Sequence, residues 1–389
     1  MIVRQFLQWQ RTASAADRAD ATTALARGYL YSDLSPDDRA ATEGALIMVL
    51  DDPSPLVRTA LAQALAFSEL SPPPVIVALA ADQPEVASWV LEYSPLLVDA
   101  DLVDAVATGG PQAQVAIANR APLPCAVSAA IAEVGTAEAC LVLIENAEAE
   151  IAPVSLDRTV ARYGHLAAIR EAMLAREGLP APTRQALVVK LSETLAGFVT
   201  ARAWLAEDRA QRVAKEACEK ATVSLVAASP DSEIPPLVRH LRESGQLTAG
   251  LILRALLSGN VDLFEQALAE LSGLSLARVS ALVHDKRGNG FRALYDRAGL
   301  PASTYAAFRE ATDAMREGGF VGDQSGATRL RRRMVERVLT RCADDAAADI
   351  EPLLTLLRRF AAEAAREEAR MLCRDLAAEE EVEPRRAAA

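Results

Sequence analysis

The stretch Asp52-Pro53-Ser54-Pro55-Leu56-Val57-Arg58 begins a pattern that occurs four times in this chain: a turn containing Asp, Gly or Pro, followed by a short apolar helix. The later copies begin at Asp82, Gly110 and Gly135. Aligning the four copies places one apolar residue of each in equivalent positions, 29, 27 and 27 residues apart: Leu61, Val90, Ile117 and Ile144. A period of this length is typical of solenoid proteins.

A second helix is predicted after each of the four apolar helices. The predicted ranges are 73–81, 99–108, 124–134 and 153–163, and several begin with proline or aspartate, which suit a helix N-terminus. A helix pair of fewer than about 30 residues cannot bury its apolar face alone, so neighbouring pairs must stack. We therefore expect an all-α fold: an α-solenoid of short helix pairs over residues 1–195, followed by a helical C-terminal module.

The remainder of the chain lacks this period. Residues 196–231 are predicted to form one long, charged bridging helix that stops near Pro230, because proline cannot continue a helix. Glycine-containing turns divide residues 232–320 into a module of short helices. Helices are also expected over 321–378, and the charged end, 379–389, is predicted to be disordered.

Composition agrees with a helical fold and limits the possible partners. Apolar residues make up 51% of the chain but aromatics only 4%, which favours helices packed through small side chains. Up to Lys190 there are 13 basic and 23 acidic residues, a net charge of −10; the remainder has 28 basic and 30 acidic residues, a net of −2. The first half is therefore expected to repel nucleic acid and anionic membranes.

Targeting signals and paired cysteines are absent from the sequence. No stretch of about 18 uncharged apolar residues predicts a membrane span. The N-terminus lacks the basic start and apolar region of a signal peptide. The five cysteines are far apart and odd in number, which argues against disulfides and zinc sites. We expect a cytoplasmic protein.

Two resemblances follow from these motifs. The opening Asp52 to Arg58 motif resembles the HEAT repeat, although the units here are shorter. The runs 256–265 and 290–301, together with Gly273-Leu274 and Arg278-Val279, resemble an alphaproteobacterial family catalogued as domain of unknown function 2336. The repeats are similar to the first half of that family. This resemblance implies a bacterial protein of helical repeats, and it implies no activity, cofactor or site residue.

Two groups of basic residues are the candidate binding sites. Lys286 and Arg287 precede Gly288-Asn289-Gly290, a loop that either cradles a phosphate or forms a tight turn; we favour the turn, because no nucleotide-binding motif is complete. Arg329, Arg333, Arg337 and Arg341 form a stripe along one predicted helix. The stripe suits a phosphate backbone, an anionic lipid or an acidic protein. We favour local ion pairs with acidic residues of the last helix: Glu363, Glu367, Glu368 and Asp375.

No catalytic, cofactor or metal site is predicted. The three histidines, His165, His240 and His284, have no ligand partner at a suitable spacing, and no nucleophile motif is present. The leading hypothesis is a non-catalytic scaffold or adaptor that binds a basic or neutral protein segment on the solenoid. The alternative is a nucleic-acid-binding protein, such as a HEAT-like DNA-repair enzyme, that uses the arginine stripe. The sequence leaves the partner and the oligomeric state open.

Overall fold

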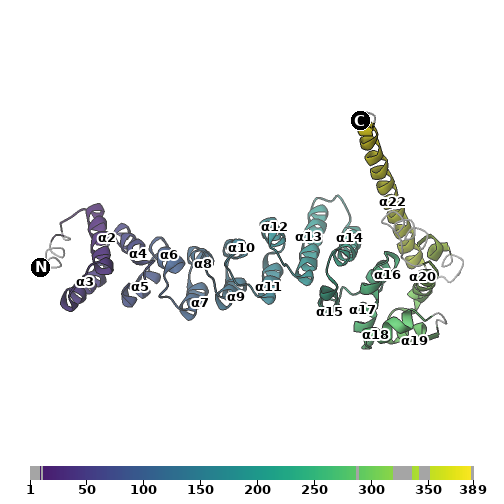
Figure 1. Ribbon diagram of the computed structural model, residues 1–389, viewed down its shortest axis with the longest axis horizontal. Coiled ribbons are helices and arrows are strands. Elements are labelled where there is room, and N and C mark those ends of the chain that lie inside the picture. Colours follow the sequence, from purple (N-terminus) through teal and green to yellow (C-terminus); the bar gives the residue numbers. More distant parts are fainter. Residues whose placement is uncertain (1–8, 10–11, 286–288, 319–334, 341–350, 387–389) are drawn as a thin grey trace. The chain divides into compact units, whose positions relative to one another are not determined.

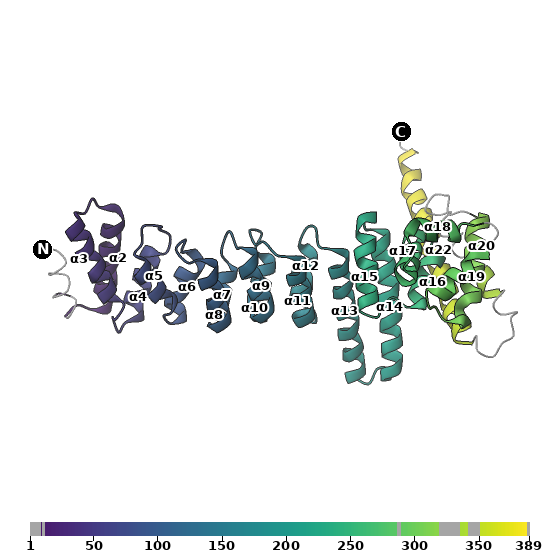
Figure 2. The ribbon, with the colours of Figure 1, turned by 90° about the horizontal axis from the view of Figure 1, so that it is seen from below.

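The computed structural model describes residues 9, 12–285, 289–318, 335–340 and 351–386. Regular structure in this part of the chain is helical (Figures 1 and 2), apart from one isolated bridge between Leu123 and Ala149. The all-α prediction is confirmed. The chain divides into two compact units, Met1–Leu179 and Pro180–Ala389, called unit 1 and unit 2 below.

Unit 1 is the predicted solenoid. Its helices are α2 (Ala15–Tyr31), α3 (Pro36–Val49), α4 (Pro55–Leu65), α5 (Pro73–Ala80), α6 (Pro84–Tyr93), α7 (Asp99–Thr108), α8 (Pro111–Ala118), α9 (Cys125–Val134), α10 (Ala137–Glu145), α11 (Pro153–Tyr163) and α12 (Ala167–Ala175). One row runs from α2 through α4, α6, α8 and α10 to α12, each helix packing on the next, and α7, α9 and α11 form part of a second row (Figure 1).

The aligned residues of the repeats occupy equivalent places in this stack. Leu61, Val90 and Ile117 are completely buried in α4, α6 and α8, and Ile144 is 2% exposed in α10. Proline stands in the first turn of α4, α6 and α8, where its missing N–H group has no intrahelical partner to lose. The predicted period is therefore the spacing at which equivalent residues of successive repeats are buried.

Unit 2 combines a helical hairpin with a bundle of shorter helices. Its elements are α13 (Ala181–Ala201), α14 (Glu207–Ala227), η1 (Asp231–Glu233), α15 (Ile234–Glu243), α16 (Ala249–Leu257), α17 (Val261–Ser272), α18 (Leu276–Val283), α19 (Asn289–Arg297), η2 (Ala302–Thr304), α20 (Tyr305–Gly318), a helical segment at 335–340 and α22 (Glu351–Arg386). The hairpin helices α13 and α14 lie side by side, and they pack on α15 and α16 respectively (Figure 2).

Aromatic side chains fill the core of the shorter helices. Phe264 of α17 stacks on Phe308 of α20, with ring centroids 6.2 Å apart. Phe291 and Tyr295 of α19 are buried beside them, and the Tyr295 hydroxyl donates a hydrogen bond to the carbonyl of Pro301 at 2.7 Å. The run 290–301, which carries the family resemblance, thus supplies core residues and the turn that follows them.

A buried ion pair attaches α22 to this core. Arg254 of α16 is 5% exposed, lies 2.6 Å from the Glu363 carboxylate and places its guanidinium carbon 4.2 Å from the Phe360 ring centroid. A buried charge needs such a partner, because removing an isolated ion from water is costly.

Two predictions about helices are wrong. The single helix expected over 196–231 is instead the end of α13, a turn, and α14. The turn contains no proline or glycine, and Ala203 adopts the left-handed conformation there, with φ of 54°, so no residue type in the sequence marks the break. The predicted boundary at 195 falls inside α13, which belongs to unit 2 from its first residue.

The predicted disordered tail, 379–389, is also wrong over most of its length. Helix α22 continues to Arg386, and residues 387–389 lie outside the described part. Alanine and glutamate have high helix propensity, so the acidic run before Pro384 extends a helix that has already begun.

Candidate functional site

Most of the predicted binding residues lie outside the described part of the chain. These are Lys286, Arg287, Arg329, Arg333 and Arg341. Arg337 is described and is half-buried, next to Val338, which is buried in the unit 2 core. The arginine stripe and the basic loop therefore stay predictions.

One of the acidic residues proposed to pair with that stripe has a different partner in the structure. Glu363 forms its ion pair with Arg254 of α16. Sequence reasoning missed this pair because the two residues are 109 positions apart, and nothing in the helical spacing of either one points to the other.

The histidines have polar neighbours. The Nε2 atom of His284 lies 2.9 Å from a carboxylate oxygen of Glu265, and the Nε2 atom of His240 lies 3.2 Å from the amide oxygen of Gln185. Within the described residues, no group of three or more His, Cys, Asp or Glu side chains is placed to hold a metal ion. These contacts position helices.

The net negative charge of the chain lies in one of its two units. Unit 1 contains 11 basic and 23 acidic residues, a net charge of −12. Unit 2 contains 30 of each, a net of zero. All of the excess negative charge therefore belongs to the repeats.

Several arginines of unit 1 bond to neighbouring repeats. Arg18 contacts both carboxylate oxygens of Asp52 at 2.8 and 2.9 Å, and Arg58 contacts those of Asp82 at 2.6 and 3.0 Å. Three further arginines donate to backbone carbonyls of an earlier repeat, about one period back in sequence: Arg120, Arg162 and Arg176. Charged donors satisfy the carbonyls at helix ends, which lack intrahelical partners.

These bonds also stabilise the charged form of two aspartates. Burial acts to raise the pKa of Asp52, but the hydrogen bonds from Arg18 and from the Ser54 N–H group outweigh it, so the pKa lies below its usual value. The pKa of Asp82 is lowered in the same way, by Arg58 and the Gln83 N–H group acting against burial.

Most of the other carboxylates of unit 1 face solvent. Exposed residues include Glu69, Glu85, Asp99, Asp101, Asp104, Glu133, Glu138, Glu145, Glu148, Glu150, Asp157 and Glu171. Several arginines are held between repeats, where hydrogen bonds engage their charge, whereas most of the carboxylates are exposed. The surface of unit 1 is therefore acidic.

Three aromatic residues form an exposed cluster on this acidic unit. The rings of Phe67 and Tyr93 are 4.6 Å apart, and those of Trp89 and Tyr93 are 6.0 Å apart. Phe67 is 63% exposed and Tyr93 41%. A hydrogen bond to the Glu92 carboxylate, with burial as a second cause, raises the pKa of Tyr93. The aromatic cluster thus combines ring faces with a carboxylate.

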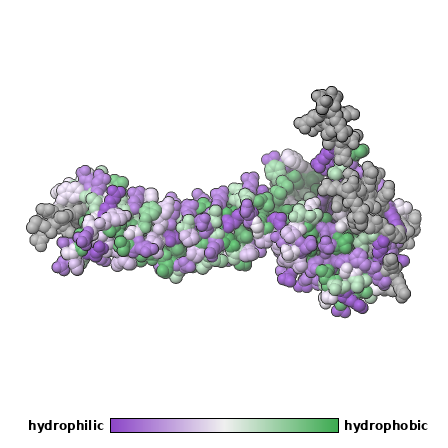
Figure 3. Space-filling view, in the orientation of Figure 1, coloured by the Kyte–Doolittle hydropathy of each residue, from purple (hydrophilic) through white to green (hydrophobic). Residues whose placement is uncertain are grey.

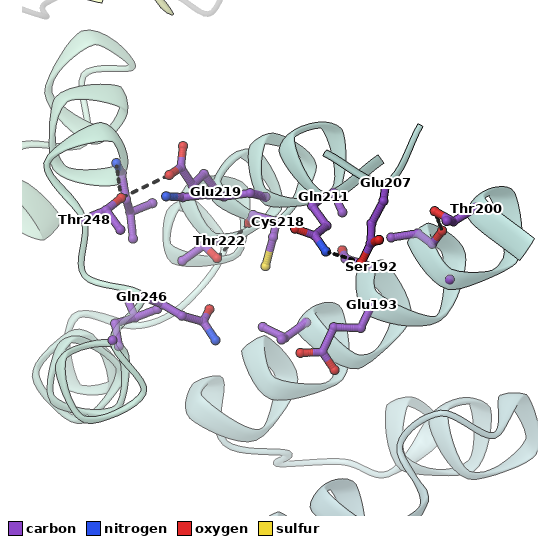
Figure 4. A pocket seen from close by; sticks show the side chains of 18 of the residues that line it. Ser192, Glu193, Thr200, Glu207, Gln211, Cys218, Glu219, Thr222, Gln246 and Thr248 are labelled. Carbon is purple, nitrogen blue, oxygen red and sulfur yellow. Dashed lines mark hydrogen bonds between the residues drawn. The ribbon is translucent and has the colours of Figure 1, made fainter. Parts of the chain in front are cut away.

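Unit 2 contains a groove along one face of the α13–α14 hairpin, with a cavity volume of about 720 Å³ (Figure 4). Small side chains recur at helical spacing along it, among them Ser192, Ala196 and Ala201 of α13 and Ala214 and Cys218 of α14, with Gly197 between them. Residues of α15, α16 and their connection close one end: Leu241, Gly245, Gln246, Thr248 and Leu251. These small residues were the sequence signal for the groove, but reading the hairpin as one helix concealed it.

Glu219 is the most buried charge in the groove. It is 9% exposed and accepts a hydrogen bond at 3.0 Å from Thr248, the N-cap residue of α16 (Figure 4). No Lys, Arg or His of the described chain lies within ion-pair distance of it. Glu193 pairs with Lys190 outside the groove, and Glu207 accepts from Gln211.

Two hydrogen-bonded glutamine side chains, Gln185 and Gln246, reach the same groove. Gln185 is completely buried, and its Nε2 atom donates to Oε1 of Gln246 at 2.5 Å. With the Gln246 oxygen engaged in this way, its NH₂ group is the part left for a ligand in the groove. The groove therefore presents a donor near α15 and a carboxylate near α16.

Two of the thiols, Cys218 and Cys140, are poorly suited to nucleophilic chemistry. Burial first, and then the charges of Glu219 and Glu193, raise the pKa of Cys218 in the groove. Burial also raises the pKa of Cys140 in unit 1 to about 11. A raised pKa lowers the thiolate fraction near neutral pH, and the thiolate is the reactive form.

Fold and sites define an all-α protein with a repeat unit and a grooved helical unit. Residues 86–348 match the model of a family described as "Uncharacterised protein conserved in bacteria (DUF2336)", and the chain belongs to that family. The family resemblance is confirmed, whereas the alphaproteobacterial source and the HEAT-like nature of the repeats stay predictions. No curated protein and no solved structure matches the chain. Within the described residues, no helix is both long and apolar enough to span a membrane.

Proposed function

We propose that the protein is a non-catalytic, cytoplasmic scaffold or adaptor whose HEAT-like unit 1 binds a basic segment of a protein partner. The observation that carries this proposal is the separation of charge: arginines bond between repeats, and carboxylates face solvent. A surface of this kind attracts Lys- and Arg-rich segments and repels phosphate backbones.

The aromatic cluster supplies a specific anchor within the acidic surface. A Lys or Arg side chain lying over the rings of Phe67 or Tyr93 gains a cation–π interaction, and the Glu92 carboxylate is beside it. Exposed aromatics are also frequent binding hot spots. Charge therefore brings the partner to unit 1, and the cluster fixes its register.

Fluorescence anisotropy with the full chain tests this proposal. The probe is a labelled peptide of alternating Lys and Ala with one central Arg, and the comparison probe has Glu in place of every Lys and Arg. We expect binding of the basic probe, weakening with salt, and about tenfold weaker binding by Phe67→Ser/Tyr93→Ser. These side chains are exposed, so the variant keeps its fold.

The matched control is Val77→Ser/Val98→Ser, which changes two apolar residues of unit 1 with similar exposure outside the cluster. It is expected to bind as tightly as the unmodified chain. If the cluster variant binds as tightly as the unmodified chain, the interaction is unspecific charge attraction. Tighter binding of a single-stranded DNA probe favours the nucleic-acid alternative.

A further inference from the structure

The hairpin groove of unit 2 has the dimensions of a helix-binding site. Its lining on α13 extends from Val189 to Ala201, about 18 Å at 1.5 Å per residue. On α14 the lining recurs at helical spacing from Glu207 to Thr222. Small residues on both helices let a third helix approach closely and place its side chains between theirs.

The chemistry of the lining favours a helix over an extended segment. The walls are helices whose backbone groups bond within the helix, so an extended peptide finds no backbone partners there. Its own N–H and C=O groups would lose water without replacement, which is costly. A helix satisfies its backbone internally and presents only side chains.

The charged residues that line the groove favour a positively charged ligand. The lining contains three carboxylates, Glu193, Glu207 and Glu219, and one cation, Lys215, and among the described residues only Glu193 has a further cation beside it, Lys190 outside the groove. Glu219 is nearly buried and has no cation within ion-pair distance in the described chain. A Lys or Arg of a ligand would pair with it and remove the cost of a buried, uncompensated carboxylate. An anionic ligand would be repelled.

Apolar residues continue past the groove on the distal part of the hairpin. Leu195, Phe198 and Trp204 are 54%, 45% and 63% exposed, and apolar surface gathers near the end of α13 in the space-filling view (Figure 3). Arg202 lies over the Phe198 ring at 4.1 Å. Exposed apolar surface of this extent is typical of interaction sites.

We propose that the groove between α13 and α14 binds an amphipathic, basic helix of a partner protein. The small or apolar face of that helix packs on the hairpin, and one of its Lys or Arg side chains pairs with Glu219. This site is separate from the aromatic cluster of unit 1, and it does not depend on the function proposed for that unit.

Binding of a model helix by the full chain tests the proposal. The probe is a labelled peptide of about 18 residues with Ala and Leu on one helical face and Lys on the other. A shuffled peptide of the same composition, which has no apolar face, is the comparison. We expect the amphipathic peptide to bind about tenfold more tightly than the shuffled one, and Glu219→Gln to lose about tenfold in affinity.

A filled groove provides a second variant that leaves the fold intact. Gly197 is exposed, and a Cβ atom placed on it meets nothing within 4 Å, so Gly197→Trp is tolerated and occupies the groove. The matched control is Thr194→Trp, an exposed position on the same helix that does not line the groove. We expect Gly197→Trp to abolish the preference for the amphipathic peptide over the shuffled one, and Thr194→Trp to leave that preference unchanged.

Several outcomes would overturn the proposal. Equal binding of the shuffled peptide removes the requirement for a helix, and unchanged binding by Gly197→Trp removes the groove. If the free chain is a dimer that Gly197→Trp converts to a monomer, the occupant is a second copy. The basic probe of unit 1 should bind Gly197→Trp normally, so failure of one proposal is distinguishable from failure of the other.

Discussion

Unit 1 and unit 2 are both all-α, but different interactions stabilise them. In unit 1 the helices from α4 to α12 have 8 to 11 residues each, and arginines bond one repeat to the next. In unit 2 the hairpin helices have 21 residues each, and aromatic rings fill the neighbouring core. Short helices need neighbours to be stable, whereas a large core buries enough apolar surface by itself.

The difference also determines what each unit presents to a partner. Bonds between repeats engage several arginines of unit 1, and its carboxylates outnumber its basic residues, so its outer surface is acidic. Unit 2 is electrically balanced, and its ion pairs attach helices to one core, as Arg254 and Glu363 do. Its distinctive surface is a groove of small side chains. Two kinds of binding surface therefore follow from two ways of packing helices.

The largest expected effect is on the aromatic core of unit 2. Phe264 is completely buried against Phe308, so Phe264→Ala leaves a cavity and should cost about 3–5 kcal/mol of unfolding free energy. Hydrogen exchange, followed by mass spectrometry, should show lost protection from α15 to α20 and unchanged protection in α4 to α11. Phe264→Leu is the control and should cost less. Equal loss of protection in both units would mean that they unfold together.

A smaller effect is expected from the arginine bonds of unit 1. Arg176 donates to the carbonyls of Ile144, Asn146 and Ala149 at 2.9, 3.1 and 3.3 Å. Arg176→Ala leaves these groups without their charged donor and should cost about 1–3 kcal/mol, measured by urea unfolding. The exposed Arg27→Ala is the control, expected within about 0.5 kcal/mol of the unmodified chain. An equal effect of both would remove the special role of bonds between repeats.

Sequence reasoning succeeded where structure is local and periodic. An apolar residue recurring at a fixed period and proline at helix starts predicted the helices of unit 1 almost residue by residue: α7 and α11 have the predicted ends. It failed at the turn between α13 and α14, because Ala203 adopts a conformation that alanine rarely takes. The groove between α13 and α14 could not be predicted without that turn. The Arg254–Glu363 pair depends on tertiary packing, which helical spacing cannot encode.

Acidification is expected to weaken unit 1 through Asp52 and Asp82. Their pKa values in the folded chain lie below the unfolded value of about 3.9. Stability from their ion pairs is therefore complete above about pH 4 and is lost as pH falls through the folded pKa values. The midpoint of urea unfolding, followed by hydrogen exchange in unit 1 at several pH values from neutral to acidic, measures the loss of stability.

Relief of repulsion among the other carboxylates acts in the opposite direction, so a variant must isolate the two aspartates. Asp52→Asn/Asp82→Asn lacks the charged pairs at every pH. It should be less stable than the unmodified chain at neutral pH, and the difference should shrink on acidification. A difference in stability that is independent of pH would show that the two side chains stabilise unit 1 through packing and not through their charge.

The smallest expected effect concerns the reactivity of single thiols and leaves the fold unchanged. The labelling rates of cysteines in the two units can be compared directly. Cys140, buried in unit 1 with its pKa raised to about 11, should react with iodoacetamide at pH 8 far more slowly than the exposed Cys125. Cys218 lines the groove of unit 2, where burial and two glutamates raise its pKa, so it should also react slowly. Mass spectrometry of labelled peptides gives each rate.

The two slow thiols should respond differently to a ligand. The amphipathic lysine peptide covers Cys218 if it occupies the groove, which lowers access to the sulfur, but it leaves Cys140 unchanged because that thiol is closed off by α9 and α10 themselves. In Glu219→Gln the repulsive carboxylate is gone, so Cys218 should react faster in the free chain while Cys140 keeps its rate. Equal changes at both cysteines would indicate general opening of the fold rather than a groove-specific effect.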